Sequence, residues 1–256
     1  MAERGLHRVE EVMGIPVGID VRDAGADPAA VERAFAHLRW VDATFSTYRA
    51  ASEVRRLDAG TLAPADAHPA VRSVLARCER LRARTRGCFD VRATGALDPS
   101  GFVKGWAVDR AGALLDAAGV ARWCVDAGGD VLVRGGGWRV GVRHPDLPRA
   151  LAGVVVVDDG AVATSGAYER GAHVRDPHTG RAPAGVRSVT VLGRELATAD
   201  AYATAAFAMG ERGPAWTARL RGHGAMTVLA GERVVATPSF LARCPGGSLA
   251  ASLSGG

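Results

Sequence analysis

The stretch RWCVDAGGDVLVRGGGWRVGVRHP (122–145) consists of short, largely apolar runs that are separated by pairs and triplets of glycine. Such runs are typical of β-strands joined by tight turns. The pattern continues in LAGVVVVDDGAVATSG (151–166) and SVTVL (188–192), and the segments AMTVLAG and ERVVATP (225–238) predict a closing hairpin around Gly231. We therefore expect strands to dominate the second half of the chain.

Three helices are predicted before these strands. Residues 27–48 begin with Asp27 as N-cap and Pro28 at the first helical position, and then repeat apolar residues at helical spacing. Residues 68–85 and 104–118 are also predicted helices, and a glycine ends each of them. Residues 195–209 predict a fourth helix, which follows the first strands of the second half. Near the start of the chain, EVMGIPVGIDVR (11–22) predicts a strand. Helices followed by runs of strands indicate an α+β fold rather than regular βαβ alternation. We expect one domain over residues 1–244 and a disordered Gly- and Ser-rich tail over residues 245–256.

The composition is that of a soluble globular protein. Hydrophobic residues make up 48% of the 256 residues and charged residues 23%, and the net charge of +5 comes from scattered arginines. No basic stripe is interleaved with aromatic residues, which argues against nucleic-acid binding. The four cysteines form no CxxC pair and are predicted to be free thiols. No apolar run approaches the ~18 residues of a membrane span, and the first residues contain no apolar signal core, so a cytoplasmic location is predicted.

Lys104 is the only lysine, and it follows Asp98 by six residues in LDPSGFVKGWAVDRAGALL (97–115). The segment predicts a loop that enters a helix near Lys104, where the helix macrodipole disfavours a cation. One interpretation is a solvated lysine. The other is that the helix amides and the ammonium together bind a phosphate, which would remove the conflict with the dipole.

Asp200 and Thr204 are four residues apart in an alanine-rich predicted helix, so they share one face. A carboxylate on a buried helix needs a partner, which can be a structural hydrogen bond or a hard cation such as Mg²⁺. Gly128 and Gly129 in DAGGD (126–130) fit either a hairpin turn or a close approach of the backbone to a phosphate or flavin.

The segment HVRDPHTG (173–180) places His173, Asp176 and His178 within six residues. Its plain interpretation is an Asp-Pro turn in which the carboxylate caps local amides. A metal site through the two histidines is not favoured, because a loop interrupted by Pro177 gives them no common face.

Taken in order, the motifs resemble the ApbE family, the FAD:protein FMN transferases. The resemblance runs from MGI (13–15) to MG (209–210). Between these ends it rests on FSTYR (45–49), SE (52–53), FD (89–90), GAL (95–97), KGWAVD (104–109), DAGGD (126–130), ATSG (163–166), HVRDPHTG (173–180) and ADAYAT (199–204).

The resemblance implies an ApbE-type α+β fold with antiparallel or mixed sheets and two lobes around an FAD cleft. It also implies magnesium-dependent transfer of the FMN half of FAD to a threonine hydroxyl of an acceptor flavoprotein, with release of AMP. The implied cofactor-binding positions are Met13, Gly14, Ile15, Tyr48, Gly95, Ala96, Leu97, Asp98, Lys104 and Arg175. The implied magnesium ligands are the Gly101 carbonyl and the side chains of Asp200 and Thr204. His173 lies in the implied active-site loop and is our candidate general base.

Four positions depart from the family pattern. Leu97 directly precedes Asp98 where many members have a longer segment, Ile15 replaces a threonine, Asp126 replaces an asparagine, and Ala167 replaces a polar residue. Two alternatives to the transferase stay open at this point. One is an FAD pyrophosphatase that uses water as the nucleophile, and the other is a flavin-binding module without catalysis.

Overall fold

The computed structural model describes residues 5–147, 149–166, 174–247 and 249. One eight-stranded sheet runs through the molecule in the order β1-β2-β3-β4-β7-β8-β9-β10, and every pairing in it is antiparallel. Its strands are β1 (Leu6–Val12), β2 (Ile15–Val21), β3 (Trp123–Ala127), β4 (Asp130–Arg134), β7 (Gly160–Gly166), β8 (Val186–Gly193), β9 (Gly224–Leu229) and β10 (Val234–Ala236). A separate hairpin is formed by β5 (Trp138–Arg143) and β6 (Leu151–Val157). The predicted α+β class with antiparallel sheets is confirmed.

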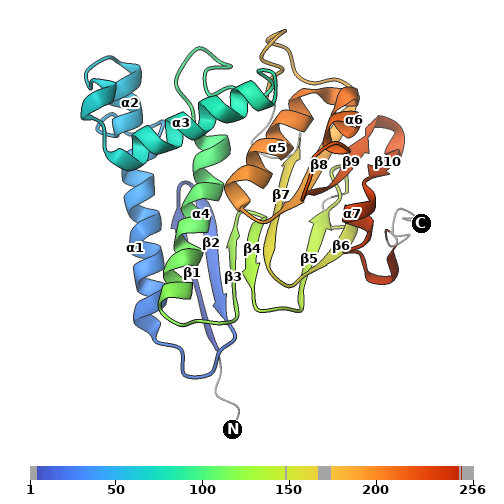
Figure 1. The fold of residues 1–256 in the computed structure, drawn as a ribbon, viewed down its shortest axis with the longest axis horizontal. Coiled ribbons are helices and arrows are strands. Elements are labelled where there is room, and N and C mark those ends of the chain that lie inside the picture. Colours follow the sequence, from blue (N-terminus) through green and yellow to red (C-terminus); the bar gives the residue numbers. More distant parts are fainter. Residues whose placement is uncertain (1–4, 148, 167–173, 248, 250–256) are drawn as a thin grey trace.

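Helices α1, α4 and α5 cover one face of the sheet (Figure 1). Helix α4 packs between α1 and α5, and all three contact the strands, while α2 and α3 lie together at one end. The helices are α1 (Pro28–Phe45), α2 (Glu53–Asp58), α3 (Pro69–Arg84), α4 (Ser100–Ala117), α5 (Leu196–Ala208), α6 (Gly213–Thr217) and α7 (Pro238–Leu241). Short 3-10 turns occur at Pro64–Asp66, Gly210–Arg212, Ala230–Glu232 and Pro245–Gly247. None of the helices in the described ranges is long and apolar enough to cross a membrane.

Two hydrophobic cores lie on opposite faces of the sheet because side chains alternate along each strand. In β4, Leu132 belongs to the larger core under the helices, whereas Val131 and Val133 belong to a smaller core that β5, β6 and α7 cover. In β9, Ala225 and Met226 divide between the cores in the same way. The four cysteines are free, as predicted.

The prediction of one strand over residues 11–22 was wrong, because the chain turns at Met13 and Gly14 and forms the β1–β2 hairpin. Both residues have positive φ, +58° and +71°. That is the backbone of a two-residue hairpin turn, which Asn-Gly normally marks. Met-Gly is not a typical hairpin-turn pair, so the sequence of residues 11–22 does not reveal the turn.

The helix predicted from Lys104 begins four residues earlier, at Ser100. The Asp98 carboxylate accepts a hydrogen bond from the Ser100 amide (2.9 Å), and the amides of Phe102 and Val103 donate to the Pro99 carbonyl. Lys104 therefore lies in the second turn of α4 and not at its mouth. Residues 248 and 250–256 of the predicted tail lie outside the described part of the chain.

Gly105 lets the backbones of α4 and α5 meet. A Cβ built on it would lie 2.6 Å from both the Cα and the N of Ala197, and 2.7 Å from the carbonyl carbon of Leu196. These are backbone atoms at the start of α5, which a side-chain rotation cannot move away. The close contact therefore requires glycine at this position of α4.

The amino end of α5 is capped from α4. The Asp109 carboxylate accepts hydrogen bonds from the amides of Leu196 (2.8 Å) and Ala197 (3.0 Å), which have no intrahelical acceptor. Burial nevertheless raises the pKa of Asp109 to about 6, because it outweighs the two hydrogen bonds to the ionised form.

Gly105→Ala is expected to lower the free energy of unfolding by about 1–3 kcal/mol, since overpacking outweighs the gain in helix propensity. Chemical denaturation measures the change. Gly101→Ala is the matched control in the same helix, because a Cβ there meets no atom closer than 3.5 Å. Equal stability of the two variants would contradict the close contact.

Asp109→Asn is expected to flatten the pH dependence of stability. A carboxyl whose pKa is 3.8 when unfolded and about 6 when folded stabilises the protein most below pH 4 and loses that contribution as the pH rises through 6. The unfolding free energy of the unsubstituted protein minus that of the variant should therefore fall by about 2 kcal/mol between pH 4 and pH 7. Urea denaturation at several pH values checks this, and parallel pH profiles would refute it.

Candidate active site

A cavity of about 560 Å³ lies where both halves of the chain meet, a size typical of small-molecule sites. Its walls come from the β1–β2 turn, the end of α1 with the segment after it, residues 88–94, the start of α4, the end of β7, residues 174–177 and α5. The predicted site residues that line it are Met13, Gly14, Ile15, Tyr48, Asp98, Gly101, Lys104, Arg175, Asp200 and Thr204. Positions that are far apart in the sequence therefore form one site.

Lys104 is held against the cavity wall by two buried carboxylates. Its Nζ lies 2.5 Å from Oδ2 of Asp130 and 3.7 Å from Oδ2 of Asp200. The side chains of Asp130 and Asp200 are 1% and 4% exposed, and Asp130 also accepts a hydrogen bond from the Thr164 amide (2.9 Å). Asp130 begins β4 and Asp200 lies on α5, so the ammonium is oriented by two different elements. Of the two interpretations of Lys104, the solvated surface lysine is wrong.

Oxygen donors gather beside this ion pair. Thr204 lies one turn after Asp200 on α5, and its Oγ1 lies 3.2 Å from Oγ of Ser165 at the end of β7. Gly101, in the first turn of α4, lies beside the same spot, since a Cβ built on it would make an ordinary van der Waals contact of 3.6 Å with Thr204 Oγ1. Gly101, Asp200 and Thr204, the predicted magnesium ligands, thus come together. Within the described ranges, no three His, Cys, Asp or Glu side chains are grouped to hold a metal ion by themselves.

The DAGGD motif forms the turn between β3 and β4. Gly128 and Gly129 have φ of +65° and +97°, and the Gly129 amide donates to Asp126 Oδ1 (2.8 Å). A Cβ on Gly128 would lie 3.4 Å from Ile15, so the turn packs against the β1–β2 turn. The predicted hairpin turn is confirmed, and neither glycine is among the described residues that line the cavity.

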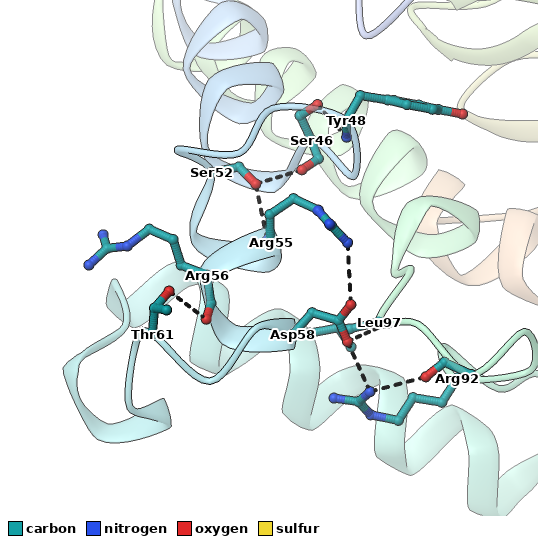
Figure 2. Close-up of polar contacts among 10 residues, drawn as sticks. Ser46, Tyr48, Ser52, Arg55, Arg56, Asp58, Thr61, Arg92 and Leu97 are labelled. Carbon is teal, nitrogen blue, oxygen red and sulfur yellow. Dashed lines mark hydrogen bonds and ion pairs between the residues drawn. The ribbon is translucent and has the colours of Figure 1, made fainter.

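The segment after α1 forms another wall and is fastened to α2 (Figure 2). Ser46 Oγ accepts hydrogen bonds from the amides of Tyr48 and Arg49 (both 3.2 Å). The buried Ser52 donates to the Ser46 carbonyl (2.6 Å) and caps α2 by accepting from the Arg55 amide (3.1 Å). Tyr48 lines the cavity with 93% of its surface exposed, which leaves its ring available to a ligand.

The GAL motif does not itself reach the cavity. Ala93 and Thr94, directly before it, are lining residues, whereas Gly95, Ala96 and Leu97 are not among the described lining residues. Leu97 is buried, and its amide donates to Asp58 (2.9 Å). The direct cofactor contacts implied for these three residues have no support in the cavity's lining.

Residues 174–180 form the Asp-Pro turn expected from their sequence. Asp176 Oδ1 accepts from the His178 amide (2.9 Å), and Arg175 donates to the Gly180 carbonyl (3.0 Å). Val174, Arg175 and Pro177 line the cavity. His173, the candidate general base, and Ala167 lie outside the described residues.

Asp130 and Ser165 were not predicted as site residues, although both stand in motifs that the sequence singles out, DAGGD and ATSG. The available signal was a charged or polar residue next to glycine at the boundary of an apolar strand. That signal does not reveal the partner, because the contacts with Lys104 and Thr204 span 26 and 39 residues.

Comparisons with known proteins agree with this arrangement. The sequence profile of the ApbE family matches residues 13–96 and 92–227. The chain is 37% identical over 161 residues to the FAD:protein FMN transferase of Rhodobacter capsulatus, a match that covers 57% of this chain and 31% of that protein. It is 36% identical over 131 residues to the FAD:protein FMN transferase of Vibrio cholerae serotype O1, covering 45% of this chain and 39% of that protein. The matches thus span less than half the length of these two relatives.

The fold is also shared with solved structures. The ApbE protein of Thermotoga maritima superimposes with a TM-score of 0.83 at 22% identity, over 94% of this chain and 100% of that one. The structural match supports the fold, and the profile match extends over most of the sequence and includes the residues that line the cavity from both halves. The chain belongs to the ApbE family.

Proposed function

We propose that this protein is an FAD:protein FMN transferase, which moves the FMN half of FAD onto a threonine hydroxyl of an acceptor flavoprotein and releases AMP. The observation that carries the proposal is the meeting of Lys104, Gly101, Asp200 and Thr204 at one wall of the cavity. These residues come from the two helices whose motifs match the family pattern. The names of the matched relatives agree with this activity.

The reaction replaces the phosphoanhydride bond of FAD by a phosphoester bond to threonine. The threonine oxygen forms a bond to the phosphorus of the FMN half, the bond from that phosphorus to the bridging oxygen breaks, and the bridging oxygen leaves with AMP. Such transfers depend mainly on positioning and on neutralising charge. Lys104 supplies a fixed positive charge, because its carboxylate partners orient it at the cavity wall. His173 is proposed to take the threonine proton, since Asp200 is assigned to a metal.

The donor set fits magnesium. A carboxylate, a hydroxyl and a backbone carbonyl are hard oxygen ligands, and Mg²⁺ commonly completes its shell with water and substrate phosphates. Asp200, Thr204 and the Gly101 carbonyl are therefore proposed to hold the ion. When bound there, Mg²⁺ would act as a Lewis acid on the phosphate oxygens. A cytoplasmic location stays a prediction from the sequence.

The two alternatives differ in the fate of FAD. A pyrophosphatase would release FMN and AMP without any acceptor. A flavin-binding module would bind FAD without turnover, and the gathering of oxygen donors at Asp200 and Thr204 argues against it, because flavin binding alone does not need a metal site.

The decisive test combines the protein with FAD, Mg²⁺ and a flavoprotein fragment that carries a target threonine. We expect covalent flavin fluorescence on the fragment in a denaturing gel, its loss with EDTA and its return with excess Mg²⁺. Asp200→Ala should lower the transfer rate by at least about a hundredfold, because the metal loses its charged ligand. No labelling of a fragment that a control transferase labels would refute the proposed function.

A matched pair on α5 serves as the control for the metal site. Thr204→Ala removes a proposed ligand, whereas Thr198→Ala removes a hydroxyl that bonds Glu195 and does not line the cavity. Only Thr204→Ala should raise the Mg²⁺ concentration needed for half-maximal transfer. Equal Mg²⁺ requirements of the two variants would contradict the assignment.

Lys104→Met should impair both stability and transfer, because it leaves the buried Asp130 without its ammonium partner. Loss of one member of a buried ion pair costs about 3–5 kcal/mol. Adding Asp130→Asn removes the uncompensated charge of the nearer partner while Asp200 keeps its charge, so the double variant should recover part of the free energy of unfolding and none of the transfer rate. Denaturation and the gel assay measure the two quantities separately, and recovery of transfer in the double variant would show that Lys104 serves only the fold.

A further inference from the structure

Asp58, the last residue of α2, joins two segments that both line the cavity (Figure 2). Its Oδ1 accepts hydrogen bonds from the Leu97 amide (2.9 Å) and from Arg92 Nη1 (3.1 Å). Its Oδ2 lies 3.4 Å from Arg55 Nη1. The Asp58 side chain is 16% exposed, whereas the side chains of Arg55 and Arg92 are 43% and 52% exposed, so the contact with the Leu97 amide is the partly buried one.

One of the two segments leads directly into α2. Residues 46–49 line the cavity, and Ser52 fastens their turn to the first turn of α2 through its hydrogen bonds with Ser46 and Arg55. Helix α2 is only six residues long, so its cap at Ser52 and the carboxylate of Asp58 lie at the two ends of one short helix. The wall that carries Tyr48 is thereby connected to Asp58.

The second segment, residues 91–98, is a closed loop that contributes Val91, Ala93, Thr94 and Asp98 to the cavity. The Asp98 amide donates to the Val91 carbonyl (2.7 Å), and the Gly95 amide donates to the Arg92 carbonyl (2.8 Å). Asp98 then caps the start of α4. Since Asp58 binds Leu97, directly before Asp98, it contacts the loop where the loop enters the helix that carries Gly101 and Lys104.

The contacts of Asp58 are charge-assisted and go to both main chain and side chain. The Leu97 amide and then the Arg92 guanidinium lower the pKa of Asp58, so the ionised form is the one that holds the loop. Arg92 Nη1 also donates to the Gly95 carbonyl of its own loop (3.4 Å). One carboxylate thus fixes both ends of residues 92–97.

We propose that Asp58 is a positioning residue for FAD: it locks the 91–98 loop to the 46–58 segment and so sets the separation of two walls of the cavity. The inference rests on the proposed function for the identity of the ligand. Asp58 does not itself line the cavity, so it acts through Leu97, Arg92 and the loop that they hold.

The test compares Asp58→Ala, Asp58→Asn and the control Asp66→Ala, which alters an exposed aspartate on the neighbouring 3-10 turn. FAD affinity is measured by quenching of flavin fluorescence, and transfer by KM and kcat for FAD. Asp58→Ala should raise the Kd and KM for FAD by about tenfold while changing kcat by less than about threefold, since it removes ground-state positioning. The effect of Asp58→Asn should be smaller, because the amide oxygen still accepts from Leu97. Asp66→Ala should match the unsubstituted protein.

Hydrogen–deuterium exchange of the FAD-free protein provides a second measure that does not depend on activity. Amides of residues 91–98 should exchange faster in Asp58→Ala, while those of α4 and α5 keep the rates of the unsubstituted protein. Unchanged exchange in the loop, or an unchanged Kd for FAD, would overturn the proposal. If the unsubstituted protein transfers no FMN, the proposed function fails, and the loop exchange rates still decide the role of Asp58. If Asp58→Ala unfolds, the same comparison is made with Asp58→Asn.

Discussion

The contact between the backbones of α4 and α5 at Gly105 is the constraint on which the site depends. Helix α4 carries Gly101 and Lys104, and α5 carries Asp200 and Thr204. A side chain at Gly105 would separate the helices by displacing the start of α5. Such a separation would draw Lys104 away from Asp200 and would widen the gap between Gly101 and Thr204. The packing of these two helices therefore determines the distances between the residues of the candidate site.

Electrostatics reinforces that packing. Buried charges are costly unless they are paired, and here the pairs join different elements: Lys104 of α4 with Asp130 of β4 and Asp200 of α5, and Asp109 of α4 with the amino end of α5. These contacts tie the two helices to each other, and the contact of Lys104 with Asp130 ties α4 to the sheet. The polar residues beside the cavity thus also fix the relative positions of the helices and the strand that form its walls.

Features that depend on neighbouring residues could be predicted from the sequence, whereas contacts between residues far apart in the chain could not. Asp27 and Pro28 marked the start of α1 because capping is local, and the spacing of Asp200 and Thr204 placed them on one face because a helix repeats every 3.6 residues. The family resemblance supplied the association of Lys104 with Asp200. The Met13-Gly14 turn was missed because its residue types do not signal it, and α4 began four residues early because Pro99 and Asp98 organise its first turn. Asp130, Ser165 and Asp58 were missed as site or positioning residues, because each depends on a partner at least 26 positions away.

The burial of Lys104 has a practical consequence. It is the only lysine of the chain, and its side chain is 22% exposed beside the cavity. Every lysine ε-ammonium signal from this sequence therefore originates at this one position. Labelling with isotopically enriched lysine therefore gives one NMR signal set that reports on the cavity. A reagent that modifies lysine side chains can react only with Lys104.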